Sequence, residues 1–228
     1  MFDEAAMSGA TARRERARKE MRAAIIEAAR GIIVDQGVDA LTIRSVAARL
    51  GYSAGALYEY FASKEAILLA LYFESEDGMD RAIARAVDGL PAGADPEEVL
   101  VAIGHAYRRH ALDHGELYRM AFDTFKTPPV PGGEEPDHTR EGAFGILLRV
   151  AERGVREGVF IDAEPIAIAF SAWAGVHGFV SLEVTGRLAG GDGPGRPAAT
   201  PEAGRDRRDH LFDLHARAIA RGYTRKEP

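Results

Sequence analysis

The sequence contains no cysteine, which excludes disulfide bridges and thiolate-ligated metal centres. A cysteine-free chain suits a reducing compartment, so a cytoplasmic location is expected. No run of apolar residues is expected to reach the roughly 18 residues that a membrane span requires. The first residues lack the basic and then apolar pattern of a secretion signal. Neither secretion nor contact with a membrane is therefore expected.

Motifs that carry catalysis or bind nucleotides are also missing. The sequence has no Gly-x-Ser-x-Gly, no His-Glu-x-x-His and no phosphate-binding glycine loop. His110 and His114 are four residues apart and could share a helix face, but no third metal ligand is evident. No catalytic site, metal site or cofactor is predicted. An enzyme that uses an apolar pocket is a remote alternative without motif support.

Alternating apolar and polar residues, which are typical of half-buried strands, are nearly absent. Ala, Arg, Glu and Leu are frequent, and all four favour helices. The chain is therefore predicted to be all-α, and residues 1–12 are expected to be disordered. Including their capping residues, the predicted helices cover 16–36, 42–50, 53–61, 63–88, 95–113, 115–125, 138–157, 163–188 and 205–222.

Positive charge is concentrated near the N-terminus, although the whole chain has a net charge of −6. Residues 11–64 contain ten Lys or Arg and six Asp or Glu, which gives this segment a net charge of +4. Such an asymmetry indicates that one part of a chain meets an anionic partner. A basic run leads into the first clear helix and is interpreted either as a DNA-contacting arm or as a solvated charge run: Arg13, Arg14, Arg16, Arg18, Lys19 and Arg22.

Residues 42–61 are predicted to form a helix-turn-helix. Ala47 is small where the two helices cross, and Gly51 supplies the turn, where a positive φ costs glycine little. The inner face is expected to bury Ile43, Val46, Leu50, Leu57 and Phe61. A second helix presented in this way can enter the major groove of DNA.

The outer face of this motif carries the residues expected to contact DNA. Small side chains at the start of the second helix allow close approach to base edges, and hydroxyl groups and helix N-termini suit phosphate oxygens. Glu59 could read a cytosine amino group or discourage wrong sequences. The predicted DNA contacts are Thr42, Arg44, Ser53, Ala54, Gly55, Ala56, Tyr58, Tyr60 and Lys64.

The segment Leu-Tyr-x-Tyr-Phe-x-x-Lys-Glu over residues 57–65 closely resembles a signature of the TetR family of transcriptional regulators. The resemblance covers roughly residues 16–70. It implies a three-helix DNA-binding domain over residues 13–68 and a larger helical ligand-binding and dimerisation domain over residues 69–225. Tyr52 departs from the pattern, because a smaller aliphatic residue is common there. The resemblance implies a homodimer on double-stranded DNA with a palindromic operator.

Trp173, His177 and Gly178 resemble the Trp-His-Gly signature of one subclass of TetR C-terminal domains. Trp173 and His177 are four residues apart and share a helix face. An apolar pocket would suit an unidentified apolar or aromatic ligand that releases a repressor from DNA, whereas a filled core is the alternative. A transcriptional activator and a ligand-independent DNA-binding protein are the alternative functions. The candidate pocket residues are Tyr107, Met120, Phe122, Phe125, Phe144, Phe170, Trp173 and His177.

Overall fold

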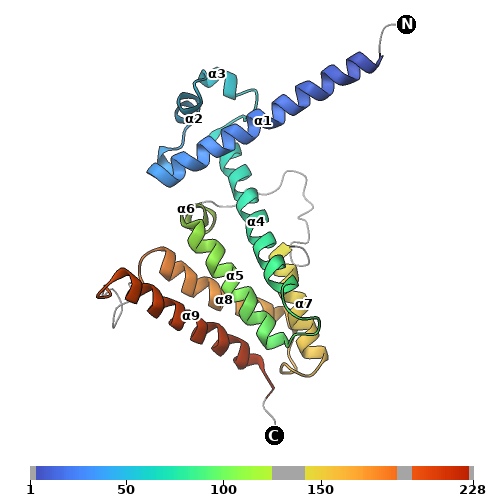
Figure 1. Ribbon diagram of the computed structural model, residues 1–228, viewed down its shortest axis with the longest axis vertical. Helices are drawn as coiled ribbons and strands as arrows, with labels where there is room; N and C mark the ends of the chain where they lie inside the picture. Colours follow the sequence, from blue (N-terminus) through green and yellow to red (C-terminus); the bar gives the residue numbers. More distant parts are fainter. Residues whose placement is uncertain (1–3, 125–141, 189–196, 226–228) are drawn as a thin grey trace. The chain divides into compact units, whose positions relative to one another are not determined.

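The computed structural model describes residues 4–124, 142–188 and 197–225, and every named element in these ranges is a helix. The prediction of an all-α fold is confirmed. The chain divides into a first unit, residues 1–75 and 116–127, and a second unit, residues 76–115 and 128–228. The main helices are α1 (Glu4–Gln36), α2 (Ile43–Leu50), α3 (Ala54–Leu57), α4 (Lys64–Asp88), α5 (Pro96–Asp113), α6 (Gly115–Arg119), α7 (Gly142–Arg156), α8 (Pro165–Val184) and α9 (Pro201–Tyr223) (Figure 1).

Helix α1 begins at Glu4, earlier than the predicted start at Arg16, so residues 4–12 are helical where disorder was expected. The physical reason is local propensity, since four of the nine residues in this stretch are Ala and it contains no proline. The helix ends as predicted at Gly37, whose φ of 84° only glycine adopts at little cost.

The first unit has an apolar core shared by its helices. Ile25, Ile32 and Ile33 of α1 are buried together with Val46 of α2 and Leu71 of α4. The short helix α6 and the π-helical turn Met120–Thr124 that follows it add two further buried side chains, from Leu117 and Met120. This core holds the short helices α2 and α3, which lack the length to be stable alone.

The second unit is a helical bundle in which α5 contacts α7, α8 and α9, while α8 contacts α7 and α9. Asp95 caps α5 by accepting a hydrogen bond from the Glu97 N–H at 2.7 Å, as its position before Pro96 predicts. Phe160 and Phe212 are fully buried in this bundle. Gly154 lies directly against the Phe160 ring, where a Cβ atom would overlap with ring carbons.

An ion-pair network with a buried pair, Arg108 and Glu183, at its centre joins three helices of this bundle. The Arg108 guanidinium of α5 donates two hydrogen bonds of 2.7 Å to the Glu183 carboxylate of α8. It also lies 2.7 Å from the Asp209 carboxylate of α9, and Arg208 lies 3.3 Å from Glu183. Burial alone would lower the pKa of Arg108, but the hydrogen bonds to Glu183 and Asp209 raise it above the ordinary value.

Helix α8 corrects the expectation that no stretch is apolar enough for a membrane span. Its mean hydropathy reaches 1.4 over 18 residues, which satisfies that criterion by length and composition alone. The helix nevertheless packs against α5, α7 and α9, and Glu183 near its end takes part in the buried ion pairs. Only 28% of the window is buried, so α8 also exposes an apolar face.

Candidate DNA-binding surface and ligand cavity

Helix α2 begins with a complete capping box. The Thr42 hydroxyl accepts a hydrogen bond from the Ser45 N–H at 2.9 Å, and the Ser45 hydroxyl accepts one from the Thr42 N–H at 2.9 Å. The helix ends at Gly51, which has φ 75° and ψ 25°. Both ends therefore match the sequence prediction, because the residue types suit these two terminal conformations.

Helix α3 is shorter than predicted, since it ends at Leu57 and not at Phe61. Ser53 caps it as expected, accepting a hydrogen bond from the Ala56 N–H at 3.3 Å. After Leu57 the chain forms a tight turn in which the N–H groups of Tyr60 and Phe61 both donate to the Leu57 carbonyl. Leu57 and Phe61 are buried in the core of the first unit, and these two anchors fix the turn between them.

Five of the nine residues predicted to contact DNA are exposed, and they lie at the start of α2 and along α3. Tyr58 is 56% exposed and can offer its hydroxyl to a phosphate oxygen. Ala54, Ala56, Tyr60 and Lys64 are only partly exposed. The five exposed contacts are Thr42, Arg44, Ser53, Gly55 and Tyr58.

Two polar groups expected at the DNA surface have partners inside the first unit. The Lys64 ammonium donates a hydrogen bond to the Val38 carbonyl at 3.2 Å, closing the loop between α1 and α2. The Arg22 guanidinium of α1 donates to the Tyr60 carbonyl and stacks over the Phe61 ring at 4.0 Å from the ring centroid. Sequence reasoning placed Arg22 in the basic arm, because a contact 38 residues along the chain leaves no local signal.

The charges around the motif are unevenly distributed. Residues 13–19 in the first half of α1 are exposed and carry most of the basic arm. In the first turn of α4, a hydrogen bond from Ser63 lowers the pKa of the Glu65 carboxyl, so this group is ionised at neutral pH. An ionised acid in the first turn interacts favourably with the helix dipole.

Several predicted pocket residues meet in an aromatic cluster of the second unit. The Tyr107 hydroxyl lies 2.9 Å from Nδ1 of His177, and the rings of Trp173 and His177 have centroids 5.9 Å apart. Phe144 contacts Phe170 at 4.8 Å and Trp173 at 6.3 Å between ring centroids. These separations are those of rings in direct contact, so the side chains of the cluster pack against one another.

The other predicted pocket residues do not join this cluster. Met120 is 1% exposed in the core of the first unit, with Leu117. Phe122 is 40% exposed and its ring contacts that of Tyr118 at 4.8 Å between centroids. Phe125 lies outside the described residues.

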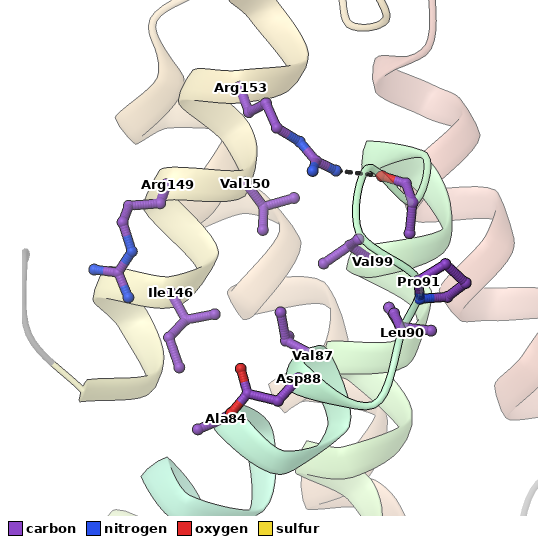
Figure 2. Close-up of a pocket in the computed structure, with 11 residues that line it drawn as sticks. Ala84, Val87, Asp88, Leu90, Pro91, Val99, Ile146, Arg149, Val150 and Arg153 are labelled. Atoms are coloured by element: carbon purple, nitrogen blue, oxygen red, sulfur yellow. Dashed lines mark hydrogen bonds between the residues drawn. The ribbon is translucent and has the colours of Figure 1, made fainter.

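The second unit contains a cavity of about 450 Å³ between α4, α5, α7 and the loop that joins α4 to α5 (Figure 2). Its size lies within the range of small-molecule sites. None of the predicted pocket residues lines it, because those residues are mostly aromatic and this cavity is lined by aliphatic and charged side chains. The lining residues are Ala84, Val87, Asp88, Leu90, Pro91, Ala94, Val99, Ile146, Arg149, Val150 and Arg153.

Histidines of the second unit take part in packing and hydrogen bonding. The rings of His110 and His114 contact each other with centroids 4.6 Å apart, as their spacing predicts, while His105 lies 3.1 Å from the Asp213 carboxylate. Within residues 4–124, 142–188 and 197–225, no three His, Asp or Glu side chains are grouped to hold a metal ion.

Two family models match the chain. The one described as bacterial regulatory proteins of the tetR family matches residues 25–71, and the one described as a tetracyclin repressor-like C-terminal domain matches residues 100–206. Together they match more than half of the 228 residues. The first match includes all nine predicted DNA contacts.

The chain is also similar to individual proteins and to solved structures. The chain is 27% identical over 204 residues to the HTH-type transcriptional regulator Rv1816 of Mycobacterium tuberculosis, covering 77% of this chain and 85% of the relative. It is similar in structure to a protein of unknown function from Rhodococcus sp. RHA1, with a TM-score of 0.69, 24% identity, and coverage of 90% and 95%. It is also similar to the TetR family transcriptional regulator PfmR from Thermus thermophilus, with a TM-score of 0.61, 22% identity, and coverage of 88% and 99%.

Proposed function

The chain belongs to the TetR family of DNA-binding transcriptional regulators, and from this premise we propose that it is a repressor that binds a palindromic operator as a homodimer and is released by a small molecule. The observation that carries the proposal is the capped α2, the Gly51 turn and the exposed face of α3. This arrangement leaves Gly55 and Tyr58 open to solvent on a short helix that the core of the first unit holds in place.

We divide the chain into a DNA-binding domain, residues 13–68, and a regulatory domain, residues 69–225. We assign base recognition to Gly55 and to the partly exposed Ala54 and Ala56, because their small side chains let the backbone approach thymine methyl groups and base edges. Tyr58 and Arg44 hold phosphates, which set the register of the protein on DNA but carry no sequence information.

The homodimer is supported by an uncovered apolar face on α8 and α9, which lie side by side in the second unit (Figure 1). Leu182 of α8 is 42% exposed and Leu214 of α9 is 52% exposed. Ala174 and Gly178 of α8 are also exposed, and their small size allows a second copy to approach closely. A four-helix interface made by α8 and α9 of two copies would cover this face.

A two-fold dimer places two copies of α3 in successive major grooves, with half-sites about 34–36 Å apart or at a longer in-phase spacing. Such symmetry requires a palindromic operator. A ligand lowers DNA affinity if it binds better to a dimer whose two α3 helices have another spacing. The size of the effect is set by the difference in ligand affinity between the two dimer states. The cavity between α4, α5 and α7 offers this ligand a site, and the resemblance of residues 173–178 to the Trp-His-Gly subclass is compatible with it.

The remaining assignments follow from this proposal. A regulator acts without catalysis, so we assign the chain no enzymatic activity. It works where the DNA is, in the cytoplasm and on the nucleoid. An activator and a ligand-independent DNA-binding protein would use the same DNA-binding surface. A reporter assay with and without inducer distinguishes both of them from a ligand-released repressor.

The proposal is tested by selecting bound DNA from a random duplex pool with the full-length protein. We expect a palindromic consensus, and its half-site spacing measures the distance between the two α3 helices. Gly55→Asp places a negative charge at the point of closest approach and should abolish enrichment. Arg156→Ala alters an exposed arginine of α7 with a side chain 67% exposed and serves as the matched control. No enrichment by the wild-type protein at low salt would reject specific DNA binding.

A further inference from the structure

We propose that Glu59 reads one base of each half-site, by accepting a hydrogen bond from the exocyclic amino group of a cytosine in the major groove. The inference rests on the proposed function, since it assigns base specificity to a further residue of the same DNA-binding surface. It follows from three features: the position of Glu59 opposite the buried anchors of its turn, its lack of a counter-charge among the described residues, and the hydrogen bonds that a carboxylate can make with base edges.

The turn after α3 directs Glu59 away from the core of the first unit. The Phe61 N–H donates to the Leu57 carbonyl at 3.0 Å, so residues 57–61 form one turn with the hydrogen-bond spacing of an α-helix. Leu57 is 1% exposed and Phe61 is 3% exposed. Glu59 lies two residues from each anchor, which is about 200° around a helix with 3.6 residues per turn. It is accordingly exposed.

This orientation puts Glu59 on the face that the proposed function presents to DNA. Tyr58 keeps right-handed helical backbone angles, φ −63° and ψ −20°, so the helical course of α3 continues as far as Glu59. Gly55 precedes Glu59 by four residues, and residues four apart on a helical course share a face. Gly55 and Tyr58 are both exposed. We therefore expect the Glu59 carboxylate beside the point where the Gly55 backbone approaches the bases.

The charge of Glu59 is not neutralised by any residue that the structure describes, because no ion pair or hydrogen bond joins its carboxylate to one of them. Two cations that reach this part of the first unit are bonded to backbone carbonyls. The Lys64 ammonium donates to Val38, and the Arg22 guanidinium donates to Tyr60. A carboxylate without a counter-charge is repelled by DNA phosphates, and a donor on a base edge offsets this cost.

The base edges of the major groove determine which base can supply that donor. A carboxylate accepts hydrogen bonds but donates none. Guanine presents the N7 and O6 acceptors and thymine presents the O4 acceptor, so both repel the carboxylate. Adenine places its N6 amino group next to the N7 acceptor, whereas cytosine presents the N4 amino group alone. Cytosine is therefore the base that Glu59 favours.

The test repeats the selection from a random duplex pool with full-length wild-type protein, Glu59→Ala and Glu59→Gln. The wild-type consensus should contain a cytosine at one position of each half-site, and replacing that base should lower affinity about 5- to 100-fold. Glu59→Ala should lose the preference at this position alone. Glu59→Gln should move it to adenine, because an amide can donate to N7 and accept from N6. An unchanged consensus in either variant would overturn the proposal.

A matched control separates base reading from a general effect of charge. Glu20→Gln removes an exposed negative charge from α1, and it should leave the base preference unchanged at every position. Tighter binding of Glu59→Ala to all DNA sequences with an unchanged consensus would assign Glu59 to repulsion of phosphates alone. Unchanged affinity and consensus would make Glu59 a solvated side chain. Both results reject base reading.

Failure of this inference is distinguishable from failure of the proposed function. A wild-type palindrome that persists at every position in Glu59→Ala rejects the role of Glu59 and leaves the regulator assignment standing. If the wild-type protein enriches no DNA sequence, the regulator assignment falls and the inference falls with it. Titration of four duplexes that differ only at the cytosine position completes the test. The wild-type protein should prefer one of them, and Glu59→Ala should bind all four equally.

Discussion

Arg22→Ala should loosen the turn after α3 without removing a DNA contact. The substitution deletes a charged hydrogen bond to the Tyr60 carbonyl and the stacking of the guanidinium on the Phe61 ring. A hydrogen bond from a charged group contributes about 1.5–3 kcal/mol and a cation–π contact about 0.5–2 kcal/mol. Because the two contacts share one guanidinium they do not add fully, and a local loss of about 2 kcal/mol is expected from their combined range.

Hydrogen exchange measures this loss where it occurs. A loss of about 2 kcal/mol accelerates exchange of the Tyr60 and Phe61 amides by about 30-fold, if they exchange by local opening. Arg18→Ala is the matched control, because Arg18 lies one turn earlier on α1 and is exposed. It should leave amide exchange unchanged.

DNA binding separates the two arginines further. If Arg18 contacts a phosphate, its loss lowers the salt dependence of affinity by a slope of about 0.9, whereas Arg22→Ala keeps the slope and lowers affinity for the operator. Unchanged amide exchange in Arg22→Ala, together with a reduced salt slope, would refute the reasoning and return Arg22 to the DNA-contacting arm.

Three further changes test other parts of the molecule. Leu214→Glu should shift the protein toward monomers in sedimentation experiments at micromolar concentration, whereas Ile161→Glu, at a site 42% exposed outside α8 and α9, should not; monomers in both would implicate general misfolding. Gly154→Ala should lower the free energy of unfolding by about 1–3 kcal/mol in denaturant titrations, because the added methyl group overlaps with a buried phenylalanine ring; an unchanged midpoint would show that the ring relaxes freely. A hydrogen bond from Arg217 lowers the pKa of the Asp213 carboxyl below its ordinary value of 3.8, so this acid stabilises the fold above that value and loses its contribution as the pH falls through the folded-state pKa. The stability difference between wild type and Asp213→Asn should therefore be present at pH 6 and shrink below about pH 4, and a difference that persists at pH 2 would contradict this assignment.

The local features of the fold could be predicted from sequence because neighbouring residues determine them. Thr42, Ser53 and Asp95 all cap the helices that they precede, since each offers an oxygen to free N–H groups one turn ahead. The end of α3 was misjudged for the opposite reason. Nothing local stops the helix after Leu57, and the turn is held by buried Phe61 and by Arg22 from α1.

The cavity was missed because its walls are assembled from distant segments. Val87, Val99 and Val150 come from three helices, and none of them differs from an ordinary core residue in the sequence. Some of the aromatic residues predicted for a pocket do meet, as Phe144, Phe170 and Trp173 illustrate, and their rings pack against one another. Whether side chains enclose a space or fill it depends on packing at the scale of single methyl groups, which periodicity does not encode.

The ion-pair network of α5, α8 and α9 restricts how these helices can pack. α8 is apolar along most of its length, and apolar surfaces alone tolerate sliding and rotation, because burial is not directional. The Arg108 guanidinium must meet Glu183 and Asp209 at the same time. Separating the buried Arg108–Glu183 pair leaves an uncompensated charge, which costs about 3–5 kcal/mol, whereas the pair with the exposed Asp209 contributes less. The network therefore penalises any shift of α8 against α5, and it restricts which face of α8 stays uncovered for a second copy.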